Sequence, residues 1–228
     1  MGRETMSGKG RGLGVAAVVV GLLGVVLAVG GLAYALNSYG SSTISSQSMA
    51  PTYEPGDRII YEQVDGGEVH RGDVVLFSAP DRYGFSASVM QRVVGVGGDR
   101  VVCCTGSGTA ARITVNGKPL AEPYVKHGDV DGVHKTYDVT VPKGRLFLLG
   151  DNRANSRDSR LFASDHDGTV ADSAVRSRVT DDRTVASGIG AAVIGGVILV
   201  LVGIGLGIAA FVRRRRAVPV APWPVQQG

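Results

Sequence analysis

The sequence predicts a mostly β domain of antiparallel strands, flanked by two transmembrane α-helices. Two uncharged apolar stretches, residues 13–36 and 185–212, are each long enough to cross a membrane, which takes roughly 20 predominantly apolar residues. Neither stretch has a polar face at helical spacing, so neither is typical of a core helix in a soluble protein. Residues 37–184 carry short apolar or β-branched runs bounded by Gly, Pro or Asp, which is the pattern of strands. We therefore expect a membrane protein rather than a soluble cytoplasmic one.

Basic residues at the two ends of the chain predict its orientation. The formal charge is +2 for residues 1–36, −2 for residues 37–184 and +4 for residues 185–228. The positive-inside rule places the N-terminus (residues 1–12) and the basic, Pro-rich tail (residues 213–228) in the cytoplasm. The domain between the spans then lies outside the cytoplasmic face of the plasma membrane. Because this domain is slightly acidic, a nucleic-acid partner is disfavoured, and the basic run beside the second span is typical of topology or lipid contact.

An alternative interpretation treats the first apolar stretch as a cleavable signal peptide, since Ala33-Tyr34-Ala35 has the small-x-small pattern. The apolar core of a signal peptide has about 7–15 residues. Residues 13–36 exceed that length, so we expect an uncleaved anchor. Both stretches are rich in glycine, and Gly203 and Gly207 have a Gly-x-x-x-Gly spacing that permits close helix contact. In so glycine-rich a span this spacing is weak evidence, and oligomerisation through the spans stays open.

Short runs between the spans predict the strands of the domain. Ile113–Lys118 enters an Asn-Gly turn, the strongest short-range signal for a hairpin. The polar stretch 161–184 predicts a loop and a link to the second span, and the Pro-rich tail from Ala217 predicts disorder. The other predicted strands lie at Arg58–Tyr61, Asp73–Phe77, Gln91–Val94 and Arg145–Leu149.

The two cysteines, Cys103 and Cys104, are adjacent. Outside the cytoplasm a disulfide is chemically permitted. Free thiols, a vicinal disulfide and intermolecular pairing all stay open. The four histidines show no ligand-like spacing with the cysteines, so we expect neither a metal site nor a cofactor.

Polar residues crowd three short segments: Ser45–Thr52, Gln91–Asp99 and Gly150–Arg160. By composition alone, the first is typical of a Ser-rich linker and the second of a strand followed by a turn. The third is typical either of a surface loop or of a hub of charge-assisted hydrogen bonds that shapes a site.

In this order and behind an N-terminal anchor, these segments resemble the type I signal peptidases, membrane-bound serine proteases that remove signal peptides from exported proteins. The resemblance spans about residues 44–160. It implies a mostly β catalytic domain that dips an apolar surface toward the lipid bilayer. It also implies that the partners are signal peptides of exported preproteins, with small residues at the first and third positions before the cut. Intermediate matching segments are Tyr53–Asp57, Arg71–Val75, Val115–Leu120 and Glu122–Tyr124.

The resemblance also implies a role for each site residue. Ser48 matches the nucleophile, and its backbone N–H together with the Ser46 hydroxyl would form the oxyanion hole. Asp158 and Arg160 match a structural ion pair of the family. Ser156 matches a hydroxyl that orients the general base.

One position departs from the family. A lysine of lowered pKa acts there as general base for the serine, and this chain has Gln91 at that position. A carboxamide is not basic near neutral pH, so it offers Ser48 no proton acceptor. Two interpretations stay open. The chain is either a working peptidase with a substitute base (His70, a distant lysine, or a water held by Gln91 and Ser156), or a peptidase-like membrane protein that binds signal peptides or exported chains as a chaperone or assembly factor.

Overall fold

The computed structural model describes residues 6–106, 110–180 and 183–216. It divides into two compact units, one of residues Ser38–Asp181 and one that combines the two ends of the chain. The tail from Ala217, for which the sequence predicts disorder, lies outside the described residues.

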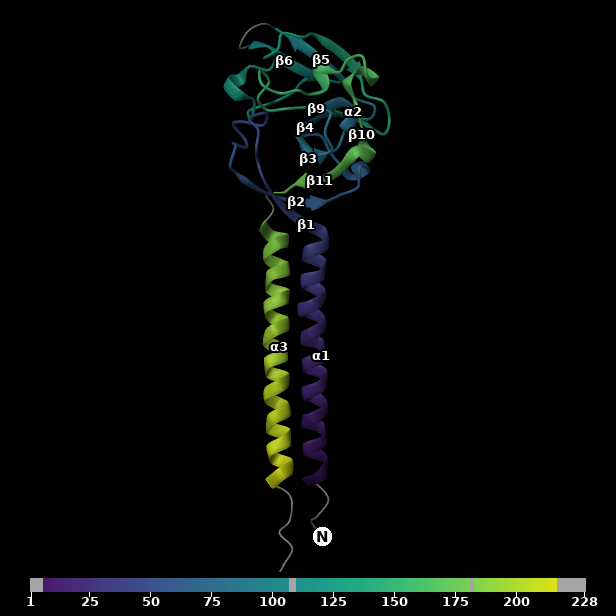
Figure 1. The fold of residues 1–228 in the computed structure, drawn as a ribbon. Helices are drawn as coiled ribbons and strands as arrows, with labels where there is room; N and C mark the ends of the chain where they lie inside the picture. Colours follow the sequence, from purple (N-terminus) through teal and green to yellow (C-terminus); the bar gives the residue numbers. More distant parts are fainter. Residues whose placement is uncertain (1–5, 107–109, 181–182, 217–228) are drawn as a thin grey trace, which may run out of the picture. The chain divides into compact units, whose positions relative to one another are not determined.

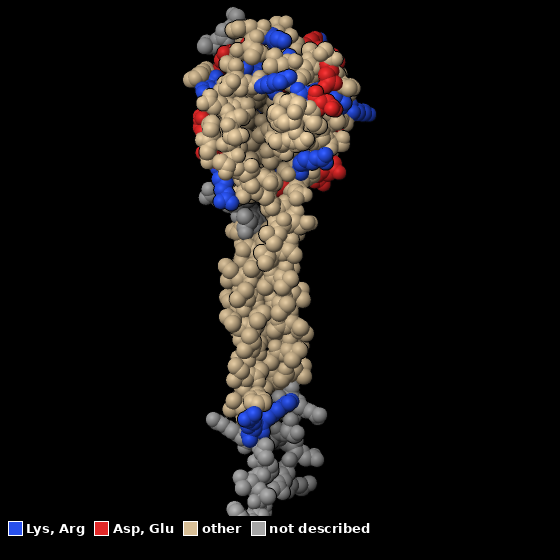
Figure 2. Space-filling model, viewed as in Figure 1, with Lys and Arg blue, Asp and Glu red and all other residues tan. Residues whose placement is uncertain are grey.

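The unit formed by the two ends of the chain contains two long helices, α1 (Met6–Ser38) and α3 (Arg183–Arg216) (Figure 1). Segments Gly12–Ser38 and Ser187–Arg215 are long and apolar enough to cross a membrane, which confirms the two predicted apolar helices. On the face drawn in Figure 2 the described helices are uncharged over nearly their whole length, with Lys or Arg side chains only at one end.

Glycines bring α1 and α3 into close antiparallel contact. A Cβ atom on Gly24 would lie 2.6 Å from the carbonyl oxygen of Gly196, and one on Gly203 would lie 2.8 Å from the backbone nitrogen of Gly21. A larger residue at either position would therefore force the helices apart. Gly207, the partner of Gly203 in the predicted motif, has a looser contact, with the Ala17 Cβ at 3.9 Å. The glycines of both spans thus pack the two helices of one chain together.

The unit Ser38–Asp181 contains two antiparallel sheets among its described residues (Figure 1). The seven-stranded sheet has the order β1-β2-β11-β3-β4-β9-β10 and the four-stranded sheet the order β7-β6-β5-β8. In chain order the strands are β1 (Tyr39–Thr43), β2 (Arg58–Gln63), β3 (Val74–Phe77), β4 (Val89–Val96), β5 (Arg100–Thr105), β6 (Arg112–Val115), β7 (Lys118–Pro119), β8 (Tyr137–Thr140), β9 (Arg145–Leu149), β10 (Val170–Ala171) and β11 (Val175–Val179). The short helix α2 spans Pro80–Tyr83, and single 3₁₀ turns lie at Gly66–Glu68, Lys126–Gly128, Ser159–Leu161, His166–Gly168 and Asp172–Ala174. The predicted antiparallel β fold is confirmed.

The stretch 161–184 was predicted to be a loop and a link, and this is wrong. It contributes β10 and β11, and β11 lies inside the large sheet between β2 and β3. Its polar composition obscured the strand, because two of the five residues of β11 are arginines and one of them, Arg178, is paired within the fold. Arg178 forms ion pairs with Glu62 and Asp73, while Val175 is buried in the core.

Three apolar clusters hold the β unit together. One, which includes Val94, Ile113 and Phe147, contains buried residues of both sheets. A third cluster, of Ile44, Met49, Ile59, Val74 and Met90, packs around the Ser45–Thr52 segment. In the four-stranded sheet Cys103 and Cys104 form a disulfide with each other, one of the three states that the sequence left open.

Candidate active site

Ser48 lies on a fixed loop rather than on a linker. The loop follows β1, and the two residues after Ser48, Met49 and Ala50, are completely buried. Ser48 itself is half-buried, and its Oγ lies 3.0 Å from the Oγ of Ser46. Burial of Met49 against the core therefore holds two serine hydroxyls side by side near the surface. The linker interpretation of this segment is wrong.

Asn152 anchors the Ser48 loop from the other polar segment. Its backbone N–H donates to the Ser48 carbonyl oxygen at 3.0 Å, and its Nδ2 donates to the Gln47 carbonyl oxygen at 3.1 Å. Gly150 makes this approach possible, because a Cβ there would lie 2.6 Å from the Ser48 carbonyl oxygen and would collide with the Ser156 hydroxyl. The Ser48 carbonyl oxygen and the Ser156 hydroxyl thus both lie next to Gly150. The Ser156 hydroxyl is buried and has no hydrogen-bond partner among the described residues.

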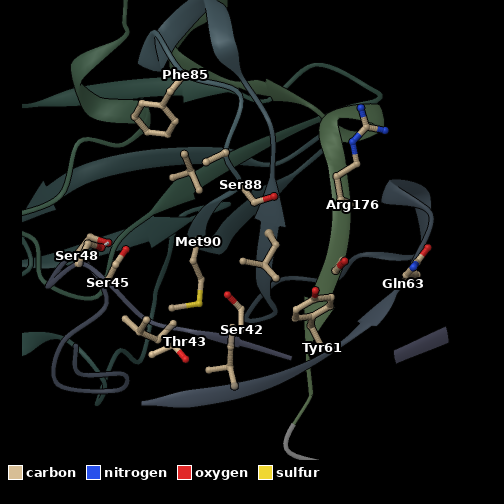
Figure 3. A pocket seen from close by; sticks show the side chains of 17 residues that line it. Ser42, Thr43, Ser45, Ser48, Tyr61, Gln63, Phe85, Ser88, Met90 and Arg176 are labelled. Carbon is tan, nitrogen blue, oxygen red and sulfur yellow. Dashed lines mark hydrogen bonds between the residues drawn. The ribbon is translucent and has the colours of Figure 1, made fainter. Parts of the chain in front are cut away.

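A cavity of about 740 Å³ extends from Ser48 across the large sheet (Figure 3). Its volume lies within the range of ligand pockets, about 300–1,000 Å³. Ser48 lies at one end, with the Ser46 hydroxyl beside it, and Arg176 and Gln63 lie at the opposite end. The cavity lining also includes apolar side chains: Ile44, Ile59, Leu76, Val89 and Met90. The arrangement fits an extended peptide whose backbone carbonyl reaches Ser48.

Gln91 is on β4 next to the cavity-lining Met90, but it is not among the residues that line the cavity. Its side chain is 2% exposed, and its Nε2 donates to the Tyr83 hydroxyl at 3.2 Å and to the Arg157 carbonyl oxygen at 2.9 Å. The Tyr83 hydroxyl donates to the same carbonyl oxygen at 2.9 Å. Burial raises the pKa of Tyr83 to about 12, so this hydroxyl stays protonated at neutral pH. Gln91 therefore serves as a buried hydrogen-bond donor.

Asp158 and Arg160 form a buried bidentate ion pair. The Asp158 carboxylate accepts from the Arg160 guanidinium at 2.8 and 2.7 Å and from the Gly150 N–H at 3.1 Å. Arg160 also donates to the Arg153 carbonyl oxygen at 2.8 Å. The pair thus fixes both ends of the loop that carries Asn152 and Ser156. Breaking a buried pair of this kind costs roughly 3–5 kcal/mol, because one charge is left without its partner.

Two further charge pairs near the site were not singled out from the sequence. Arg92 donates to Asp151 at 2.6 and 2.8 Å, with its guanidinium 4.0 Å from the Tyr124 ring centroid. Arg153 pairs with Glu122 at 2.5 Å, and both side chains are almost completely buried. The only sequence signal for them was the density of polar residues in Gln91–Asp99 and Gly150–Arg160. That density is what a hub of charge-assisted hydrogen bonds requires.

His70, considered as a substitute base, is exposed and does not line the cavity. Its backbone N–H donates to the Asp73 carboxylate at 2.9 Å. Among the residues that the structure describes, the cavity lining includes no Lys, His, Asp or Glu.

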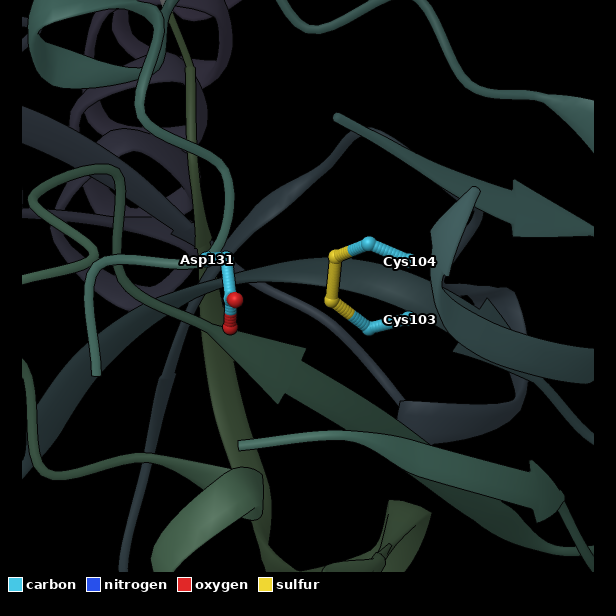
Figure 4. A group of neighbouring side chains, drawn as sticks. All are labelled: Cys103, Cys104 and Asp131. Atoms are coloured by element: carbon cyan, nitrogen blue, oxygen red, sulfur yellow. A yellow bond between two sulfur atoms is a disulfide. The ribbon is translucent and has the colours of Figure 1, made fainter. Parts of the chain in front are cut away.

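One group of side chains has the composition of a metal site: Cys103, Cys104 and Asp131, whose ligand atoms lie within 4.8 Å of one another (Figure 4). The two sulfur atoms are joined in a disulfide, so neither is a thiolate that could bind a metal. These residues do not fit a metal ion in this state.

Two neighbouring serine hydroxyls beside a peptide-sized cavity of mixed polar and apolar lining, in a β domain that carries two apolar helices, define a membrane-associated serine peptidase. Residues 15–180 match the model of the family described as signal peptidase, peptidase S26, and the chain belongs to this family.

Relatives of this chain are also named as signal peptidases. The chain is 34% identical over 132 residues to signal peptidase I V of Bacillus subtilis (strain 168), covering 52% of this chain and 73% of that protein. It is 33% identical over 148 residues to signal peptidase I of Bacillus licheniformis, covering 61% and 74%. Among solved structures, a signal peptidase I from Enterococcus faecalis is 26% identical, with a TM-score of 0.38 over 50% of this chain and 97% of that one.

Proposed function

We propose that this chain removes signal peptides from exported preproteins by cutting after small-x-small sites, with Ser48 as nucleophile. The observation that carries the proposal is the Ser46–Ser48 hydroxyl pair beside a peptide-sized cavity, in a chain of the signal peptidase family. Ile44, Ile59 and Met90 line the same cavity as Ser48, and such apolar side chains suit the small apolar side chains of a substrate.

The reaction would proceed through an acyl-enzyme. The Ser48 Oγ attacks the carbonyl carbon before the cut and loses its proton, and the amine of the mature protein leaves with a proton as the peptide bond breaks. The Ser46 hydroxyl and the Ser48 backbone N–H donate to the oxyanion that forms on the way. Water then attacks the ester, releasing the signal peptide as a carboxylate and restoring Ser48.

The acceptor of the Ser48 proton is the step in which this chain differs from its family. Gln91 cannot accept it, and no basic side chain lines the described cavity except Arg176, which is always protonated. We infer that solvent water in the cavity takes the proton, since the buried Ser156 hydroxyl is not among the residues that line the cavity. Cleavage by this route is slower than with a lysine base.

We also propose an orientation in the membrane, with both termini in the cytoplasm and the β domain outside the plasma membrane. The basic ends of the chain support this arrangement, as does the chemistry, because exported preproteins present their cleavage sites on that side.

The experiment compares the full-length chain with Ser48→Ala in a host depleted of its own signal peptidase, using a preprotein that ends its signal in Ala-x-Ala. We expect the wild type to cut and Ser48→Ala to be inactive. If both leave the preprotein intact, the chain is not a working peptidase. Capture of the intact preprotein by both would then favour the binding function.

A further inference from the structure

The cavity contains one unpaired charge, and it lies at the end opposite Ser48. Arg176 makes no side-chain hydrogen bond or ion pair with any residue that the structure describes, and it is exposed. No carboxylate lines the cavity in the described part of the chain. A ligand that fills the cavity therefore meets a free guanidinium at its far rim (Figure 3).

A β-bulge in β11 directs Arg176 to this rim. Val175 pairs with Phe77 and Ser177 with Leu76, so the register shifts at Arg176, which is the extra residue. Val175 is buried in the core cluster with Phe77, whereas Ser177 and Leu76 line the cavity. Regular alternation would put Val175 and Ser177 on the same face. The bulge turns Arg176 and Ser177 toward the cavity instead, as bulges beside functional sites often do.

The nearby carboxylates are already paired. Arg178, two residues along β11, pairs with Glu62 at 2.6 Å and with Asp73 at 3.3 Å. These acids therefore do not neutralise Arg176. Arg178 has a structural role between strands, whereas Arg176 is left available to a ligand.

We propose that Arg176 is a specificity-determining residue that selects preproteins with an acidic side chain at the far end of the cavity. The inference rests on the proposed function, since it assumes that the cleavage site reaches Ser48. The guanidinium matches a carboxylate in a bidentate geometry, and the neighbouring Gln63 and Tyr61 side chains provide further polar groups. Because each residue of an extended chain advances about 3.3 Å, the acid recognised lies several residues from the cut.

The test uses peptides with an Ala-x-Ala cleavage site in which Glu or Lys is placed at one position at a time, from eight residues before the cut to four after it. The detergent-solubilised full chain is assayed for kcat/KM. We expect one position or two adjacent ones where Glu is favoured over Lys about two- to fivefold, as for an exposed ion pair, and a smaller preference at high salt.

The variants decide the assignment. Arg176→Ala should abolish the preference and Arg176→Glu should reverse it. Lys143→Ala, which removes an equal charge from an exposed residue outside the cavity, should leave it unchanged. Equal rates for Glu and Lys at every position, or a preference that survives Arg176→Ala, would overturn the proposal. The affinities of the same peptides for Ser48→Ala and Ser48→Ala/Arg176→Ala are measured in parallel. If no peptide is cut, the proposed function fails, and these affinities alone decide the role of Arg176.

Discussion

The surroundings of Ser48 and of Gln91 differ in the way that separates a reactive group from a structural one. The Ser48 hydroxyl is half-buried at the cavity end and has the Ser46 hydroxyl as its neighbour. The Gln91 amide is 2% exposed and donates to two acceptors, the Tyr83 hydroxyl and the Arg157 carbonyl oxygen. The region around Ser48 is open to a substrate. The region around Gln91 is closed to solvent, and its amide has hydrogen-bond partners.

This difference indicates that the two serines proposed as nucleophile and oxyanion donor are open to a substrate, whereas the side chain at position 91 is held in the interior by hydrogen bonds. The buried Asp158–Arg160 pair and Asn152 hold the loops of the first region. Tyr83 and Arg157 hold the side chain in the second. Three substitutions test how far the two regions are independent.

The largest effect is expected from Gln91→Lys. Burial lowers the pKa of a lysine at this position, although any hydrogen bond to the Tyr83 or Arg157 oxygen would favour its charged form, so we expect a fraction of it to act as a base for Ser48. A general base typically contributes about 10²–10⁴ in rate, and we expect kcat for a preprotein to rise within that range.

Gln91→Met is the matched control, since it has a similar length and no basic group. It should leave kcat at or below the wild-type value. A folded Gln91→Lys chain that cuts no faster than Gln91→Met would show that the side chain at position 91 does not reach Ser48. The two regions would then be separate in function as well as in environment.

The sequence predicted the strands whose apolar residues are contiguous, such as β3 and β9, because such runs need no knowledge of the partner strand. It did not predict β11. There the charges of Arg176 and Arg178 dominate the composition, and the pairing of Arg178 with Glu62 and Asp73 joins residues more than a hundred positions apart. Long-range ion pairs leave no local periodicity, so a strand that depends on them resembles a loop.

The same limit applies to the site. Ser46 and Ser48 are two residues apart, so their proximity was visible in the sequence. The family resemblance identified Gln91 as the residue at the base position. It did not predict the contacts of Gln91 with Tyr83 and Arg157, because no spacing rule links α2, β4 and the Gly150–Arg160 segment. The burial of Met49, which turns a Ser-rich segment into a fixed loop, also depends on a core assembled from distant strands.

Ser46→Ala should have the second-largest effect. It removes the proposed oxyanion donor, which should cost about 10²–10³ in kcat and leave KM nearly unchanged, because such a donor acts in the transition state. Ser45→Ala alters another serine that lines the cavity and should stay within about twofold of wild type. Equal kcat values for Ser46→Ala and Ser45→Ala would exclude Ser46 from the oxyanion hole.

The smallest effect concerns the closed region and appears only at alkaline pH. The usual pKa of a tyrosine, near 10, applies to the unfolded chain, whereas burial raises the pKa of Tyr83 to about 12 in the fold. Between these values the folded chain keeps a proton that the unfolded chain has released. The free energy of unfolding therefore falls as pH rises from about 10 to about 12, and the contribution of Tyr83 is complete below pH 10.

Tyr83→Phe removes this titration together with the contacts to Gln91 and Arg157, so the variant should be less stable at pH 8 but lose stability less steeply above pH 10. Urea unfolding of the detergent-solubilised chain, followed by circular dichroism, measures both quantities. Between pH 7 and 9 the two curves should run parallel, which separates the lost hydrogen bonds from the lost titration. If the slopes also match above pH 10, the Tyr83 hydroxyl is accessible to solvent in solution, and the region around Gln91 is less closed than the contrast with Ser48 requires.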